Sequence, residues 1–393
     1  MPVRHDHPDD VDPFAHIREG VRRTIASFDD AYWRAKEAAH EFPMDFYEVL
    51  AAGGWIGIAI PEEYGGGGQG ITEASVMLEE IAASGAGMNG ASAVHLSIFG
   101  MNPVVKHGSE EMRRTYLPAV ADGSLHVAFG VTEPDAGTDT TAISTFARRT
   151  DGGYLVRGRK VWTTKASLCQ KVLLLVRTTP LADVQRRTDG MTLLLADLQR
   201  PAVDIVAIPK MARNAVVSCE VRYDDLFVAD SDRIGEEGKG FSYLLDGLNP
   251  ERILIAAEQI GIGRRAIQRA VEYANERVVF GRPIGMNQAI SHPLAACHAK
   301  LRAAELAVRS ASERYDRGLP CAEDANIAKY LAAEASFAAA DQALQTHGGM
   351  GYAIEYDVER YFREARLARL APISQEMVLN YLAEHVLGLP RSY

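Results

Sequence analysis

The sequence contains few cysteines and no paired ones. The four residues stand far apart, with no C-x-x-C pair and no histidine at a metal-ligand spacing. The eleven histidines are also scattered, and none falls in an H-E-x-x-H frame. We therefore expect no disulfide and no metal site, and we predict four free, buried thiols: Cys169, Cys219, Cys297 and Cys321.

Long apolar runs and an excess of basic residues are also missing. No stretch approaches the roughly 20 apolar residues that cross a bilayer, and the N-terminus, MPVRHDHPDDVDPF, is polar and acidic. The net charge is −10, so the chain has no basic footprint for nucleic acid or an anionic membrane surface. A hydrophobic content of 47% excludes a disordered chain and allows two or three domains. We expect a soluble, cytoplasmic protein that binds neither nucleic acid nor membrane.

The hydrophobic pattern changes twice along the chain. Residues 14–122 repeat apolar side chains at steps of three and four, which predicts helices. Residues 125–235 contain short β runs such as YLVRGRKVWTT and KVLLLVRTT without helices between them, which predicts a mainly antiparallel barrel or sandwich. After Gly240 the pattern is helical again. The predicted domains are 1–123, 124–236 and 237–393.

The last region is predicted to be a helical bundle. Its first helix carries an apolar stripe interrupted by Arg264 and formed by Ile253, Ala257, Ile260, Ile267, Val271 and Ala274. Further long helices are expected at 288–316, 322–347 and 374–387.

Two glycine motifs resemble phosphate-binding sequences without their context. Residues 261–266 match G-x-G-x-x-A, but they lie inside the helical stripe and follow no strand, so we interpret them as small residues for close helix packing. Residues 65–68 are four glycines without a following G-K-[ST]. A flexible surface loop is favoured over a phosphate cradle there.

Two neighbouring segments carry the most specific chemistry. The segment FGVTEPDAGTDTTAIS, residues 129–144, ends a strand in a loop rich in small hydroxyl side chains and exposed amides. The segment GRKVWTT, residues 158–164, adds an aromatic wall at Trp162. Such a combination suits a polar or anionic heterocycle, whereas each half alone fits an ordinary turn beside a core tryptophan.

Together with GWIGIAIPEEYGG, KHGSEEMRRTYLPAVADG, YANERVVFGRPIGMNQAI and QTHGGMGY, these segments resemble the acyl-CoA dehydrogenase family. The resemblance covers nearly the whole chain, in the same order. It implies a mainly α fold with an N-terminal helical domain, a middle antiparallel β-barrel domain and a C-terminal four-helix bundle. It further implies an oxidoreductase of fatty acid metabolism that binds FAD, oxidises an acyl-CoA, passes electrons to an electron-transfer flavoprotein and forms a homotetramer built as a dimer of dimers.

The resemblance also implies the residues that bind the cofactor. Those on the flavin side are Phe129, Val131, Thr132, Gly137, Thr138, Trp162, Thr163 and Thr164, with Thr138 also in the place of a serine that touches pantetheine. Those expected at the FAD of a neighbouring subunit are Arg277, Phe280 and Gln288. The adenosine-side loop corresponds to the run QTHGG, with Gln345, Gly348 and Gly349, and a corner near the C-terminus supplies Ser374 and Glu376.

The catalytic base is not where many relatives carry it. Counted without gaps from Gly349, that position is Pro372, which has no carboxylate. Some relatives place the base instead just before an arginine that matches Arg252, which makes Glu251 the predicted base, with Asn249 and Arg252 as substrate contacts. The alternative is that Glu251 only forms a salt bridge at a helix start.

The proline leaves a second question open, because it cannot donate a backbone hydrogen bond to the thioester carbonyl. Ala371 or Ile373 could donate instead, the oxygen could be bound differently, or the reaction is not an α,β-desaturation. A flavin oxidase or monooxygenase on the same fold is the alternative enzyme, and a flavin-containing scaffold is the non-enzymatic one. The end of the acyl pocket is expected near residues 91–103, where His95 either lines the pocket or is a satisfied core histidine.

Overall fold

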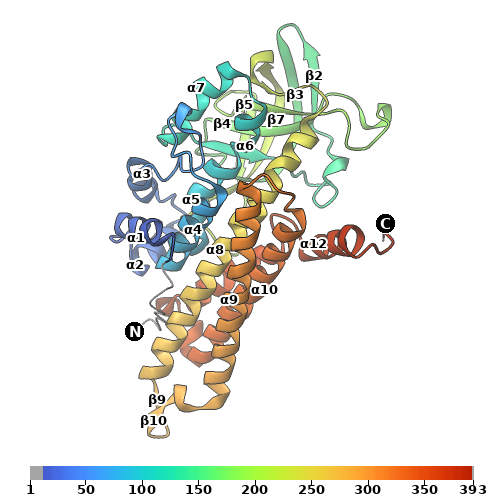
Figure 1. The fold of residues 1–393 in the computed structure, drawn as a ribbon. Coiled ribbons are helices and arrows are strands. Elements are labelled where there is room, and N and C mark those ends of the chain that lie inside the picture. The colour runs from blue at the N-terminus through green and yellow to red at the C-terminus, as the bar shows by residue number, and fades with distance from the viewer. Residues whose placement is uncertain (1–11, 392–393) are drawn as a thin grey trace.

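The computed structural model describes residues 12–391 (Figure 1). Helices come first, and they pack around a core that continues into the last third of the chain. Their bounds are α1 (Ala15–Thr24), α2 (Asp30–Ala39), α3 (Met44–Ala52), α4 (Ile71–Ile81), α5 (Gly87–Phe99), α6 (Asn102–His107) and α7 (Glu110–Ala121).

A sheet follows the helices, as the change in pattern predicts. Its strands are β1 (Val127–Gly130), β2 (Phe146–Thr150), β3 (Gly153–Thr164), β4 (Lys171–Arg177), β5 (Met191–Asp197), β6 (Val203–Ala207), β7 (Ser218–Ala229) and β8 (Arg233–Ile234). The hydrogen-bonded order is β6-β7-β3-β2-β4-β5-β8, with β1 paired to β4. Most pairs are antiparallel, and β1–β4 and β2–β4 are parallel.

The sheet is not a closed barrel, so that part of the prediction is corrected. Strands β6 and β8 end the two sides of the hydrogen-bonded path and do not pair with each other. The link between β2 and β4 is a single residue pair, Phe146 with Arg177, which joins two halves of the sheet loosely. Alternation of side chains predicts strands but not closure, because closure depends on the register between distant strands.

Three long helices form the last part of the chain. They are α8 (Gly240–Glu276), α9 (Gln288–Asp316) and α10 (Ala322–His347), and the last two match their predicted bounds. Between α8 and α9 lies a short hairpin of β9 (Val278–Val279) and β10 (Arg282–Pro283), at the end of the molecule farthest from the large sheet (Figure 1). The helix expected at 374–387 is present: α12 (Gln375–Tyr381) follows α11 (Val358–Ala365) and continues directly as a π-helical turn, Leu382–Val386. It is much shorter than α8, α9 and α10, so within residues 12–391 these three helices have no fourth of equal length.

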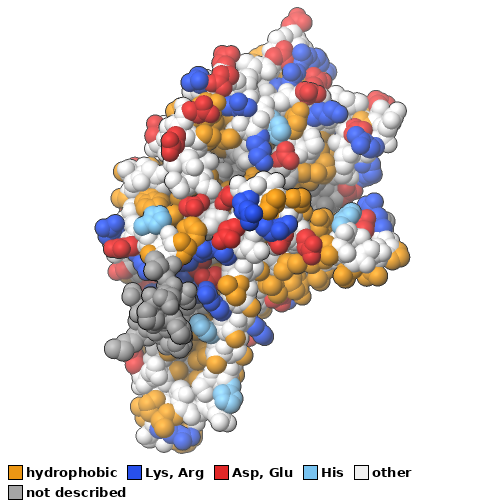
Figure 2. Space-filling model, viewed as in Figure 1, with side chains coloured by type: hydrophobic (Ala, Val, Ile, Leu, Met, Phe, Trp, Pro, Cys, Tyr) orange, Lys and Arg blue, Asp and Glu red, His pale blue; other side chains and the backbone are white. Residues whose placement is uncertain are grey.

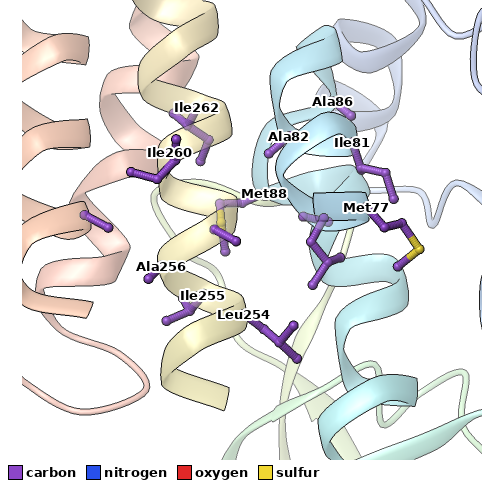
Figure 3. Close-up of a cluster of buried hydrophobic side chains, with 14 of the residues drawn as sticks. Met77, Ile81, Ala82, Ala86, Met88, Leu254, Ile255, Ala256, Ile260 and Ile262 are labelled. Carbon is purple, nitrogen blue, oxygen red and sulfur yellow. The ribbon is translucent and has the colours of Figure 1, made fainter. Parts of the chain in front are cut away.

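Helix α8 packs against α4 and α5 in the centre of the molecule. Figure 3 shows Met77 and Ala82 on one side of this contact and Leu254 and Ile260 on the other. A Cβ at Gly261 would lie 2.3 Å from the carbonyl oxygen of Glu79, so only glycine allows the two helices to approach this closely.

Close helix packing is therefore confirmed for the G-x-G sequence, which lies in the middle of α8. The predicted stripe is buried apart from Val271, which is exposed near the helix end.

The remaining general predictions have mixed outcomes. All four cysteines are free and buried, as predicted. The glycine loop is on the surface, but Gly66 and Gly67 pack directly on Ile60 and Ile58. Every helix in residues 12–391 is too short or too polar to cross a bilayer. Acidic and basic side chains are interspersed on the face shown in Figure 2.

Candidate active site

The predicted base lies within helix α8 rather than at its start. The helix begins at Gly240, and Pro250 is buried inside it. The Arg252 guanidinium donates to Asn249 Oδ1 at 3.1 Å, one turn away. Because Glu251 is more than two turns beyond the helix start, the favourable position of acids in a first turn does not explain its presence.

The carboxyl of Glu251 is half-buried, and within residues 12–391 it forms no hydrogen bond or ion pair. Burial raises its pKa to about 7, against the pull of the nearby His95 and Arg252 charges, which favour ionisation; Glu258 adds to the rise. A carboxyl group of this kind exchanges a proton near neutral pH. The predicted alternative, a structural salt bridge, has no partner in the described chain.

The corner at Pro372 lies between α11 and α12 and packs on α10. Lys329 of α10 is buried, and its ammonium donates to the carbonyl oxygen of Ile373 at 2.6 Å. Arg252 and Lys329 are close enough for each charge to oppose the other, since the pKa of Lys329 is lowered to about 8 by burial and then by Arg252. The structure therefore brings the corner and the Glu251–Arg252 segment of α8 into one neighbourhood.

Only one of the two alternative backbone donors at this corner is free. The N–H of Ala371 donates to the carbonyl oxygen of Leu367 at 2.9 Å. The N–H of Ile373 has no acceptor in the part of the chain described. At the start of α12, the hydroxyl of Ser374 accepts from the N–H of Met377 at 3.3 Å, and Glu376 is exposed.

The loop after β1 is held by a buried ion pair that the sequence analysis did not identify. Lys160 Nζ lies 2.9 Å from Glu133 Oε1 and also donates to the carbonyl oxygen of Val131 at 2.9 Å. The carbonyl oxygen of Thr132 accepts from the Val161 N–H at 2.9 Å. Strand β3 therefore fixes the backbone of this loop.

Trp162 stands at an irregularity of β3 and points outward. The pairing of β3 with β7 shifts register between Lys160 and Thr163, and Trp162 has φ of 62°. Its side chain is 55% exposed. A bulky residue in the left-handed region carries backbone strain, and a large exposed ring gains nothing from the core. A strained backbone together with an exposed aromatic ring is typical of a residue that binds a ligand.

Thr163 is buried, with a hydroxyl that has no partner in the described chain, and Thr164 is partly buried beside it. Arg213, which the sequence analysis missed, donates to the hydroxyl of Thr164 at 3.4 Å and to that of Ser92 at 3.3 Å. It lies in the turn before β7, in a stretch without periodicity, so no sequence signal pointed to it.

The tip of the same loop is open. Gly137 and Thr138 are exposed, and a Cβ at Gly137 would meet no atom within 4 Å. Phe129 is partly buried, and its ring centroid lies 5.3 Å from that of Phe99 on α5.

The other predicted cofactor residues lie at the opposite end of the long helices. Arg277 and Phe280 belong to the β9–β10 region, where Phe280 is 100% exposed. Tyr273, near the end of α8, stacks on His347 at the end of α10 with ring centroids 4.3 Å apart. The distal group therefore comprises Arg277, Phe280, Gln288, Gln345, Gly348 and Gly349, all exposed.

The two groups are too far apart to contact one FAD within one chain. From Glu251 to Arg277, α8 advances by about 39 Å at 1.5 Å per residue, which exceeds the length of an extended FAD. The long helix α8 thus separates Glu251 from the distal group.

Known proteins resemble this chain over nearly its whole length. Residues 14–124, 128–226 and 238–387 match the N-terminal, middle and C-terminal domains of acyl-CoA dehydrogenases. The acyl-CoA dehydrogenase FadE12 of Mycobacterium tuberculosis is 38% identical over 382 residues, covering 96% of each chain.

Solved structures share the fold over the same length. Butyryl-CoA dehydrogenase from Megasphaera elsdenii has a TM-score of 0.91 at 27% identity, covering 96% of this chain and 98% of that one. The FAD complex of PigA has a TM-score of 0.90 at 23% identity, with the same coverage. Because the matches to the three domains and to the curated relative extend over almost the whole sequence, the chain belongs to the acyl-CoA dehydrogenase family.

Proposed function

We propose that this protein is an FAD-dependent acyl-CoA dehydrogenase in which Glu251 is the catalytic base. The observation that carries the proposal is the half-buried, unpaired carboxyl of Glu251 with its pKa raised to about 7. Removing the weakly acidic α-proton of a thioester requires such a carboxylate, placed where water competes poorly.

Several residues of the chain fit FAD. The exposed ring of Trp162 and the open loop at Gly137 and Thr138 offer an aromatic surface and small polar groups. When bound, FAD supplies a hydride acceptor at its N5 atom. Glu251 would take the α-proton of the acyl group, and the β-hydrogen would leave with its electron pair to that acceptor, which would leave a double bond between Cα and Cβ.

The substrate contacts follow from the same neighbourhood. We propose that Arg252 and Asn249 bind the CoA end of the substrate, because the planar guanidinium pairs well with phosphate oxygens. The free N–H of Ile373 is the proposed donor to the thioester carbonyl, in place of the donor that Pro372 lacks. Such a donor stabilises the negative charge that develops on the oxygen.

We further propose that the distal group serves the FAD of a neighbouring subunit in a homotetramer. The separation of about 39 Å along α8 supports this assignment. Figure 2 shows a row of hydrophobic side chains along the projecting arm that carries α12. Leu370, Leu379 and Leu387 are exposed in this part of the chain. Exposed apolar side chains that lie together are typical of a surface that another subunit buries. The proposed domains are 1–123, 124–236 and 237–393, and the proposed electron acceptor is an electron-transfer flavoprotein.

The proposed function is tested by mixing the FAD-loaded protein with a panel of acyl-CoA thioesters without oxygen. We expect the flavin absorbance to bleach and an enoyl-CoA to form in equal amount. Rapid consumption of oxygen by the reduced protein, with a hydroxylated product, would instead support a monooxygenase. No bleaching with any thioester would support the scaffold.

A further inference from the structure

A buried pair of side chains joins α5 to α8 beside the proposed base. His95 Nδ1 lies 2.5 Å from Glu258 Oε1. His95 is 7% exposed and Glu258 is fully buried. The histidine is therefore buried and has a hydrogen-bond partner inside the protein, as expected for a satisfied core histidine.

The second oxygen of this carboxyl, Glu258 Oε2, is buried and has no hydrogen-bond partner in the described chain. The other buried glutamates behave differently. For example, Glu364 accepts from the Met88 N–H and from Asn89, and Glu133 accepts from Ser144, Thr145 and Lys160.

Among residues 12–391, Glu258 Oε2 is the one buried carboxylate oxygen without a partner. The charge of Arg213, whose buried Nε also lacks a partner in the same part of the chain, interacts with this carboxyl. An unpaired buried oxygen is unfavourable, so a hydrogen-bond donor from a ligand is expected at Glu258 Oε2.

The pair lies on the side of α8 that carries the base. Glu258 follows Glu251 by seven residues, which is about two turns and about 10.5 Å along the helix. Both His95 and Glu258 act electrostatically on the carboxyl of Glu251. A thioester whose α-carbon lies at Glu251, with its CoA end toward Asn249, would extend its acyl group in the direction of Glu258.

An aromatic wall connects the flavin side to this pair. The ring of Phe129, at the end of β1, contacts Phe99 with centroids 5.3 Å apart. Phe99 in turn contacts the ring of His95 at 4.8 Å. These contacts form a continuous row of rings from Phe129 to His95.

We propose that the His95–Glu258 pair ends the acyl part of the site and selects acyl groups that carry a hydrogen-bond donor, such as a hydroxyl, at their far end. This inference rests on the proposed function. In it, the hydroxyl donates to Glu258 Oε2 and supplies the missing partner. A plain alkyl chain of the same length would leave that oxygen unpaired, so the substrate without a hydroxyl should bind less tightly.

The test compares plain acyl-CoAs with ω-hydroxyacyl-CoAs of equal length, across a series of increasing chain length. The FAD-loaded enzyme is mixed with each compound without oxygen, and flavin bleaching gives the rate and the apparent affinity. At the chain length that reaches the pair, we expect the ω-hydroxy compound to be favoured by about tenfold or more. The quantity compared is the rate of flavin reduction divided by the apparent dissociation constant. Glu258→Gln should reduce this preference, because the amide replaces one of the two acceptor oxygens of the carboxylate with an NH2 group, which does not accept a hydrogen bond from the hydroxyl.

Glu272→Gln is the matched control, since Glu272 lies on the exposed surface of the same helix. It should keep the wild-type preference. Equal values for the two wild-type substrate series at every length would overturn the inference and leave the proposed function standing. If no thioester of either series reduces the flavin, the proposed function fails and the inference fails with it. The wild-type comparison decides the question even if Glu258→Gln does not fold.

Discussion

Lys160 Nζ lies 2.9 Å from Glu133 Oε1, and both side chains are buried beneath the loop that follows β1. The ammonium is held between a carboxylate and the carbonyl oxygen of Val131. The carboxylate keeps a lowered pKa of about 2, although burial alone would raise it, because Lys160 and the N–H and O–H groups of the loop favour its charged form. The Lys160–Glu133 pair therefore links β3 to the loop that follows β1.

Replacing Lys160 by Met should destabilise the protein by about 3–5 kcal/mol, because it leaves the Glu133 carboxylate buried and uncompensated. Denaturant unfolding of the FAD-loaded protein measures this free energy. Arg157→Met is the matched control on the same strand, where the exposed Arg157 pairs with Asp224 and Asp225. We expect the control to change the free energy of unfolding by less than about 1 kcal/mol. A similar loss for both variants would contradict the role given to the buried pair.

Trp162→Gly should separate ligand binding from stability. Glycine adopts a φ of 62° without strain, and the ring that is lost is mostly exposed, so the melting temperature of the FAD-free protein should stay the same or rise. Binding of FAD should weaken on the order of tenfold, because a large aromatic contact is removed. Fluorescence titration with FAD measures the affinity. A large fall in melting temperature with unchanged FAD affinity would show that Trp162 is structural.

The rate of flavin reduction should depend on pH through the carboxyl of Glu251. Only the ionised form accepts a proton, so the rate should rise as pH increases through about 7 and then level off. Stopped-flow absorbance at a series of pH values gives the profile, and Glu272→Gln should reproduce it. A rate that falls as pH increases over the same range would rule out an ionised Glu251 as the group that takes the proton.

Arg277→Ala should weaken FAD binding without disturbing the fold of the chain. Arg277 is exposed at the end of α8, so its loss should leave the melting temperature of the FAD-free protein almost unchanged. In the assembled protein we expect a loss of about 1.5–3 kcal/mol in FAD affinity, as for a hydrogen bond to a charged group. Arg23→Ala, on the exposed surface of α1, is the control. Equal FAD affinity for Arg277→Ala and the control would remove Arg277 from the proposed cofactor site.

The sequence predicted well those features that depend on local pattern. The bounds of α9 and α10 follow from apolar residues at steps of three and four. The G-x-G sequence at Gly261 could be separated from a dinucleotide motif because no strand precedes it. The polar exception in the α8 stripe, Arg264, has its explanation elsewhere in the chain, since it pairs with Glu79 and Glu80 of α4.

Features that depend on distant partners could not be predicted in the same way. Whether the sheet closes depends on the register of β6 and β8, which no local pattern encodes. The pairing of His95 with Glu258 joins residues 163 positions apart, and a lone histidine on an apolar helix gave no sign of it. Arg213 reaches Thr164 from an irregular turn. For Glu251 the residue type and its neighbour Arg252 were readable, whereas its burial and its lack of a partner required the structure.

The most direct test of the central claim is the rate of anaerobic flavin reduction in Glu251→Gln. The amide has nearly the same shape but cannot accept the α-proton, so with a thioester that bleaches the wild-type flavin we expect the rate to fall by about 10²–10⁴-fold. The bound FAD spectrum and the affinity for the thioester should remain close to wild type. Reduction of the variant at the wild-type rate would contradict the account and show that another group removes the proton.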